Sequence, residues 1–355
     1  MTERRLVTIR RINAIDPIEG ADAIEVATVD GWKVVVSKSD AFRINDLVIF
    51  HEIDSLLPER AEYEFLRERC YVKNSVEGAG FRLKTIKLRK QVSQGLILPV
   101  VNGTVGYETA TGGYTFKDVI EGEDVTEFLG VKKYDRILSS TLGGKARGNF
   151  PPFVPKTDAE RIQNCYRTFE REWKNHTFEV TTKLDGTSFT AYRLSCPDTG
   201  HNQFGVCSRN LDLIETEDNL YWQIARKYQL EEKLASLHFD AAIQGEIMGP
   251  TIQGNKEQLN DNKLFVFNIF DIENRIYIDA DARTTIVNNF DLDDAPCLNF
   301  VSGSNFNSVQ DFLTMADGPS YNPNVLREGI VFKSIDDPSV QFKAISNKWL
   351  LKHGE

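Results

Sequence analysis

Thr182-Lys183-Leu184-Asp185-Gly186-Thr187-Ser188 is the segment that decides how this chain is interpreted. The run before it, FEVTT, reads as a strand, and the Asp-Gly pair predicts a turn directly after the lysine. The pattern Lys-x-Asp-Gly alone is weak, since it arises by chance in roughly one chain in ten to twenty of this length. Taken alone, the segment fits a surface turn that carries a solvated lysine better than it fits a catalytic site.

Segments that follow in a fixed order make a chance match improbable. They are SRN at 208–210, GEIMG at 245–249, FNIFDI at 267–272, REGIVFK at 327–333 and QFKAIS at 341–346. The series resembles the ordered motifs of the covalent nucleotidyltransferases, which include ATP-dependent RNA and DNA ligases and mRNA capping guanylyltransferases. The resemblance covers residues 183–346.

Within that group the chain is most similar to the RNA ligase branch with an N-terminal OB-like domain, the type 5 RNA ligases. The run FPPFVPKTDAERIQN at 150–164 supports this similarity, as do the upstream strands WKVVV and FRLKTIKLRKQVSQGLILP. The resemblance implies an ATP-grasp-like ligase domain of antiparallel sheets with helices, preceded by a β-barrel domain.

The residue types suit nucleotidyl transfer without reference to any family. A lysine amine is a nucleophile only when neutral, so burial or neighbouring cations must lower its pKa from about 10.4. Asp185, Glu246 and Glu328 are candidates to hold Mg²⁺, which needs few carboxylates because it keeps several waters. Lysines would complete a clamp on the phosphates.

The resemblance assigns a role to each matching position. Lys183 is the adenylylated nucleophile, Asp185 and Gly186 complete its motif, and Arg209 contacts the nucleotide or the 5′ phosphate of the strand. The remaining assignments are Glu246 at the ribose or the metal, Phe270 stacking on adenine with Asp271 beside it, Glu328 at the metal, and Lys343 on the α-phosphate.

The last motif departs from the family pattern. Many relatives carry Lys-x-Lys there, whereas this chain reads Gln341-Phe342-Lys343. Either Lys343 suffices, or Lys333 in REGIVFK supplies part of the missing charge; the sequence does not decide. Arg161 is included because its segment resembles the same RNA ligases.

Every candidate also has a structural alternative. Glu246 and Glu328 could be acids of turns beside glycine, and Phe270 could be a core residue in an alternating apolar run. Arg209 and Arg161 could be surface cations.

The two halves of the chain differ in pattern, which predicts an α+β protein. The first 130 residues or so read as short strands separated by turns, which suggests a small OB-like barrel. We expect an OB-like nucleic-acid-binding domain at 1–138, a linker at 139–155 and a nucleotidyltransferase domain at 156–355. Helices are expected in DAERIQNCYRTFEREWKNH and DNLYWQIARKYQLEEKLAS.

Composition narrows the class of protein. The 355 residues are 41% hydrophobic and 26% charged, with no apolar run long enough to span a bilayer and no signal-peptide pattern, so we expect an intracellular protein with no membrane contact. The five cysteines are scattered, which argues against a zinc ribbon or a disulfide framework. The net charge of −10 disfavours non-specific coating of nucleic acid, but one basic stripe could contact backbone phosphates: Arg82, Lys84, Lys87, Arg89 and Lys90.

The favoured hypothesis is an ATP-dependent RNA ligase that joins 3′-OH and 5′-phosphate ends through a lysyl-AMP intermediate and an adenylylated 5′ end. The resemblance implies ATP and Mg²⁺ as cofactors, with Mn²⁺ possible. It also implies that the protein is a monomer that acts in RNA repair on nicked RNA or RNA/DNA hybrid duplexes. A DNA ligase, a capping guanylyltransferase and a catalytically inactive nucleic-acid-binding relative are the alternatives. The sequence ends soon after Lys343, so we expect the accessory domain upstream of the ligase domain. This arrangement argues against a DNA ligase and against a capping guanylyltransferase.

Overall fold

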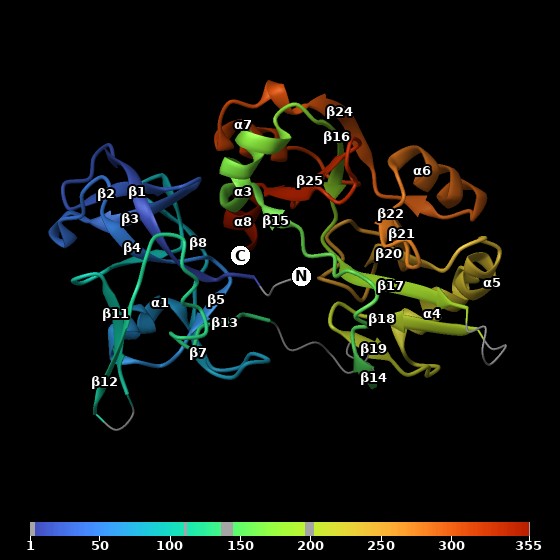
Figure 1. Ribbon diagram of the computed structural model, residues 1–355, viewed down its shortest axis with the longest axis horizontal. Helices are drawn as coiled ribbons and strands as arrows, with labels where there is room; N and C mark the ends of the chain where they lie inside the picture. The colour runs from blue at the N-terminus through green and yellow to red at the C-terminus, as the bar shows by residue number, and fades with distance from the viewer. Residues whose placement is uncertain (1–3, 110–111, 136–144, 196–201, 355) are drawn as a thin grey trace. The chain divides into compact units, whose positions relative to one another are not determined.

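The computed structural model describes residues 4–109, 112–135, 145–195 and 202–354 (Figure 1). Contacts between Cα atoms divide the chain into two compact units. One comprises residues 2–137 with 350–355, and the other comprises 138–349. Strands dominate both units, with short helices between them, so the α+β prediction is confirmed.

The first unit is built on a curved antiparallel sheet with the strand order β10-β4-β1-β2-β3. Alternating apolar residues of β1 and β4 face a core that contains Val7, Ile9 and Ile49. The strands of this sheet are β1 (Val7–Pro17), β2 (Ile24–Val29), β3 (Trp32–Ser37), β4 (Leu47–His51) and β10 (Leu96–Pro99).

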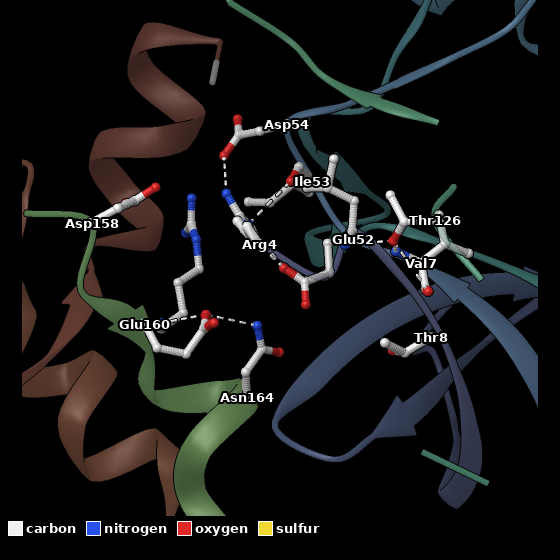
Figure 2. Close-up of polar contacts among 12 residues, drawn as sticks. Arg4, Val7, Thr8, Glu52, Ile53, Asp54, Thr126, Asp158, Glu160 and Asn164 are labelled. Carbon is white, nitrogen blue, oxygen red and sulfur yellow. Dashed lines mark hydrogen bonds and ion pairs between the residues drawn. The ribbon is translucent and has the colours of Figure 1, made fainter. Parts of the chain in front are cut away.

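Smaller sheets complete the first unit. One has the order β13-β5-β7-β6, and the others are the hairpins β8-β9 and β11-β12. Arg4 stabilises the turn after β4 by donating to Glu52 at 2.9 Å and to Asp54 at 3.3 Å (Figure 2). The bounds are β5 (Ser55–Leu57), β6 (Tyr71–Val72), β7 (Gly80–Arg82), β8 (Thr85–Leu88), β9 (Gln91–Gln94), β11 (Thr104–Glu108), β12 (Tyr114–Asp118) and β13 (Lys132–Lys133), with short helices η1 (Lys38–Asp40), η2 (Ala61–Leu66) and α1 (Arg67–Cys70).

One sheet of the second unit has the order β14-β19-β18-β17-β20-β21-β22, with β23 also paired to β21. Apolar residues on one face of β17 and β20 pack with those of α4, α5 and α6 around Phe189, Ile243 and Trp222. The bounds are β14 (Ala146–Asn149), β17 (Thr187–Leu194), β18 (Gln203–Cys207), β19 (Leu211–Leu213), β20 (Ala241–Met248), β21 (Lys263–Asp271), β22 (Ile276–Tyr277), β23 (Asp293–Asp294), α4 (Leu220–Lys227), α5 (Leu230–Ala235) and α6 (Ala280–Asn289).

The other sheet of the second unit has the order β15-β26-β25-β16-β24. One of its faces buries a cluster of aromatic rings, in which Phe169 and Phe312 lie edge to face at 4.9 Å. The bounds are β15 (Glu160–Arg161), β16 (Thr177–Lys183), β24 (Cys297–Ser302), β25 (Gly329–Ser334), β26 (Gln341–Ile345), α3 (Ile162–Thr168), η3 (Phe169–Trp173), η4 (Gly303–Asn305), α7 (Val309–Ala316) and α8 (Asn347–His353).

Local details differ from the sequence expectations. Part of the expected linker, Ala146–Asn149, is strand β14 and pairs with β19. The predicted boundary at 138 lies outside the described residues. Each long helix expected in the second half is divided: α3 continues into the π-helical turn η3, and Gln229, with a φ of 52°, separates α4 from α5.

Candidate active site

The Lys-x-Asp-Gly turn joins the two sheets of the second unit. Lys183 ends β16, and Thr187 begins β17 in the other sheet. Gly186 is required at the turn because a Cβ atom there would lie 2.2 Å from the carbonyl oxygen of Ile247. The backbone N–H of Gly186 donates to Oε1 of Glu246 at 3.1 Å. The turn therefore brings Lys183 of one sheet close to Glu246 of the other.

Lys183 lies against the carboxylate of Glu328. Its Nζ donates to Oε2 of Glu328 at 2.5 Å, and Gly329 pairs with Lys183 across β16 and β25. Burial disfavours the charged amine, but the carboxylates of Glu328, Glu246 and Asp185 outweigh burial and raise the pKa of Lys183. In this state the amine is an ammonium ion, contrary to the expectation of a lowered pKa.

The carboxyl groups of Glu246 and Glu328 are buried beside Lys183 and repel further negative charge at this place. Burial raises the pKa of Glu246 to about 8, and it also raises the pKa of Glu328. Raised carboxyl pKa values fit a site for a divalent cation, which would favour the ionised forms. Among the described residues, no group of three His, Cys, Asp or Glu side chains is close enough to form a complete metal site. Mg²⁺, which keeps several waters, requires fewer protein ligands.

Lys256 is a site residue that the sequence did not indicate. It forms an ion pair with Asp185, and its Nζ lies 4.8 Å from the centroid of the Trp349 ring. It belongs to a polar loop between β20 and β21 that has no periodic pattern. Asn255 fixes this loop by bonding to both the N–H and the carbonyl of Leu259, at 2.9 Å each.

Asp158 connects two predicted phosphate-binding cations. Lys343 donates to its Oδ1 at 2.8 Å, and Arg209 donates to its Oδ2 at 2.7 Å. Arg161, which is buried, lies beside Lys343 in the parallel pairing of β15 with β26. The structure thus brings Arg161, Arg209 and Lys343 to one edge of the sheet that carries Lys183.

Lys333 and Gln341 share the sheet face of Lys183 and Lys343. Lys333 is buried, pairs with Gln341 across β25 and β26, and donates to the backbone carbonyl of Phe267. Burial first, and then the nearby charge of Arg283, lowers the pKa of Lys333 to about 7. Gln341 accepts from Asn268 at 3.4 Å and donates to the Pro338 carbonyl at 2.9 Å.

Phe270 packs in the core and Asp271 stabilises a turn. Phe270 is 5% exposed and packs edge-on against Tyr277 at 5.1 Å, which corresponds to the core alternative rather than a stacking position. Asp271 accepts from the backbone and side chain of Asn274, both at 2.9 Å, and so builds the turn into β22. Phe267 is the partly exposed ring, and it lies 5.6 Å from Nζ of Lys333.

The basic stripe of the first unit divides into two groups. Arg82 is buried and stacks on Tyr134 at 4.1 Å, so it is not a surface cation. Lys84 is partly exposed. Lys87, Arg89 and Lys90 are exposed on the β8-β9 hairpin, where Arg89 and Lys90 form the tight turn with φ values of 46° and 68°.

Comparisons with known proteins agree with this architecture. A family model for RNA ligase matches residues 176–350, and a model for an OB-fold domain matches residues 6–100. The OB prediction for the first unit is therefore confirmed, as a half-barrel sheet. A search of curated protein sequences finds no match.

Solved structures of a Naegleria gruberi RNA ligase match the whole chain. A mutant with ATP and Mn is 38% identical, with a TM-score of 0.86 over 98% of this chain and 99% of that one. A mutant with AMP and Mn is 40% identical, and the enzyme with PPi is 39% identical, each with a TM-score of 0.87 over 99% of both chains. The chain belongs to the RNA ligase family. Among its described helices, none is long and apolar enough to cross a membrane.

Proposed function

We propose that this protein is an ATP-dependent RNA ligase that seals 3′-OH and 5′-phosphate ends through a lysyl-AMP intermediate. The observation that carries the proposal is the position of Lys183, 2.5 Å from Glu328 and at the turn where Glu246 binds Gly186. The related structures that contain ATP, AMP or PPi support ATP as the nucleotide substrate.

In the first step, Nζ of Lys183 forms a bond with the α-phosphorus of ATP. The bond from that phosphorus to the bridging oxygen breaks, and its electron pair leaves with pyrophosphate. Lys183 must first lose a proton, and Glu328 is the group placed to accept it and pass it to solvent. Lys343, Arg209 and Arg161 would stabilise the charge on the phosphate oxygens.

Asp185, Glu246 and Glu328 would hold a divalent cation, Mg²⁺ or Mn²⁺, directly or through water. When bound, the cation supplies positive charge beside the α-phosphate and favours the neutral amine. For the adenine ring, Phe267 has the more suitable position than Phe270, because it is partly exposed beside Lys333.

In the later steps, a 5′-phosphate oxygen attacks the phosphorus of lysyl-AMP, and the N–P bond breaks with return of the electron pair to Lys183. A 3′-hydroxyl then attacks the activated 5′ phosphate, loses its proton and releases AMP. We expect residues 1–138 to bind the nucleic acid, with exposed Lys87, Arg89 and Lys90 contacting backbone phosphates. The expected substrate is a nick with RNA on the 3′-OH side, distinguished by its 2′-hydroxyl.

Covalent labelling tests the first step. Incubation with α-³²P-ATP and Mg²⁺ should label the wild-type protein, and Lys183→Ala should lose the label. Lys263→Ala is the matched control, because Lys263 forms an exposed pair with Asp293 in the same unit. Label that persists in Lys183→Ala would contradict the proposal, and a preference for GTP would indicate a guanylyltransferase.

Nick sealing tests the substrate. Duplexes with ribose or deoxyribose on each side of the nick give four combinations, and we expect sealing to depend on ribose at the 3′-OH side. Equal sealing of an all-DNA nick would indicate a DNA ligase, and nick binding without label transfer would indicate an inactive relative. Replacing Arg89 and Lys90 with Glu should weaken nick binding and its salt dependence but leave labelling of Lys183 intact.

A further inference from the structure

Asp158 forms charge-assisted hydrogen bonds with two cations that the proposed function assigns to phosphate groups. Its two carboxylate oxygens accept from different residues, Lys343 at 2.8 Å and Arg209 at 2.7 Å. These cations come from different sheets, since Lys343 lies on β26 and Arg209 lies in the turn between β18 and β19. A bridging pair of anionic oxygens is also the arrangement in which a phosphate group binds two cations.

The backbone on both sides of Asp158 is fixed by other contacts. Before it, the Pro155 carbonyl accepts from Gln244 at 2.7 Å, and the hydroxyls of Thr157 and Ser188 lie 3.3 Å apart. After it, Glu160 and Arg161 pair with β26, and Glu160 accepts from Asn164 at 3.0 Å (Figure 2). The segment therefore presents Asp158 between the two cations.

We propose that Asp158 is a phosphate stand-in, which holds Lys343 and Arg209 together in the nucleotide-free enzyme and gives them up when a nucleotide phosphate binds. This inference rests on the proposed function, because it takes Lys343 and Arg209 as phosphate ligands. Two cations that converge without an anion repel each other, and the carboxylate removes that repulsion. An incoming phosphate carries more negative charge than one carboxylate and also repels Asp158, so it replaces Asp158 rather than joining it.

The stand-in has a measurable consequence for affinity. A phosphate ligand must break two contacts of Asp158 before it gains its own, so the carboxylate weakens binding. Asp158 is about a third exposed, which limits the strength of its pairs. Asp158→Asn keeps the size of the side chain and removes its charge. We therefore expect the Asn variant to bind ATP and pyrophosphate more tightly.

Calorimetric titration of ATP and of inorganic pyrophosphate, each with Mn²⁺, tests this on the full chain. Both titrations use Lys183→Met as the parent, so that no covalent product forms. Adding Asp158→Asn should tighten both ligands about three- to tenfold. Asp158→Glu, which keeps the charge, should stay near the parent, and so should Asp293→Asn, a control that removes an exposed partner of Lys263.

Unchanged or weaker binding by a folded Asp158→Asn variant would overturn the stand-in while leaving the proposed function in place. An equal gain in Asp158→Glu would also overturn it, because the effect would then not come from charge. If the parent binds neither ligand and the wild-type protein takes no label from ATP, both proposals fail.

Discussion

Lys333 and Gln341 are direct cross-strand partners on β25 and β26, on the same sheet face as Lys183 and Lys343. Gln341 occupies the position where many relatives of the nucleotidyltransferase group carry the first lysine of the last motif. The cation nearest to that position along the register is therefore Lys333, which is buried and donates to the Phe267 carbonyl. This pairing supplies a structural basis for Lys333 to replace part of the missing charge.

Replacing Gln341 with a cation or with an anion should change the affinity for pyrophosphate in opposite directions. Gln341→Lys adds a cation to the face that carries Lys343, so pyrophosphate should bind several-fold more tightly, while Gln341→Glu should weaken it by a similar factor. Calorimetric titration with pyrophosphate and Mn²⁺ measures both. Equal affinities in the three proteins would mean that position 341 does not face the phosphates.

Metal binding to the nucleotide-free enzyme should depend on pH. Burial raises the pKa of Glu246 to about 8, so at pH 7 most molecules carry a proton there that a divalent cation must displace. Affinity for Mn²⁺ should therefore rise from pH 6 to pH 8, by up to about tenfold per pH unit for one displaced proton. Titration followed by electron paramagnetic resonance measures it, and Glu246→Gln should flatten the profile. A flat wild-type profile would contradict the prediction.

A methyl group at position 186 should disrupt the turn. The Cβ atom of Gly186→Ala would meet the Ile247 carbonyl at 2.2 Å, which forces β17 and β20 apart and moves Lys183 relative to Glu246. We expect loss of most ATP-dependent labelling and a destabilisation of about 1–3 kcal/mol. Gly148→Ala is the matched control, because nothing lies within 4 Å of its added Cβ atom. Normal labelling of Gly186→Ala would show that the turn tolerates displacement.

The buried ion pair of Glu179 and Arg283 should be important for stability. Two hydrogen bonds at 2.6 Å and 3.0 Å join them, and both side chains are 3% exposed. Arg283→Met leaves Glu179 buried without this partner and should cost about 3–5 kcal/mol in urea denaturation. The double variant with Glu179→Gln should recover part of the loss, since no unpaired charge is then left at position 179. Recovery should stay incomplete, because Asp294, which also accepts from Arg283 at 3.2 Å, keeps its charge. A cost below about 1 kcal/mol for Arg283→Met would contradict this account.

Substitutions of Phe267 and Phe270 should have different effects on ATP affinity and on stability. If Phe267 stacks on adenine, Phe267→Leu should weaken ATP binding by about 1–3 kcal/mol in the Lys183→Met background. Phe270→Leu should leave ATP affinity near that of the parent and lower the melting temperature, because the Phe270 ring packs in the core against Tyr277. The reverse pattern would restore the original assignment of Phe270.

The order of short motifs was sufficient to predict the family and to name Lys183, Glu246 and Glu328. Lys183 ends β16 and Glu328 directly precedes β25, where local sequence already specifies the backbone, whereas Glu246 lies inside β20. The same patterns could not separate Phe267 from Phe270. Both belong to one alternating apolar strand, and the irregular register between β20 and β21 changes which rings are exposed.

By itself, the sequence determined the α+β class, the strand-rich first half and Lys183 as the candidate nucleophile, because periodicity, turn residues and motif order are local properties. Only the tertiary structure decided which charges meet. Lys256 reaches Asp185 across 71 residues and Lys343 reaches Asp158 across 185, and such pairings depend on how two sheets come together at one turn. The buried position of Arg82 and the pKa values of Glu246 and Lys333 were decided in the same way, since burial is a property of the packed chain.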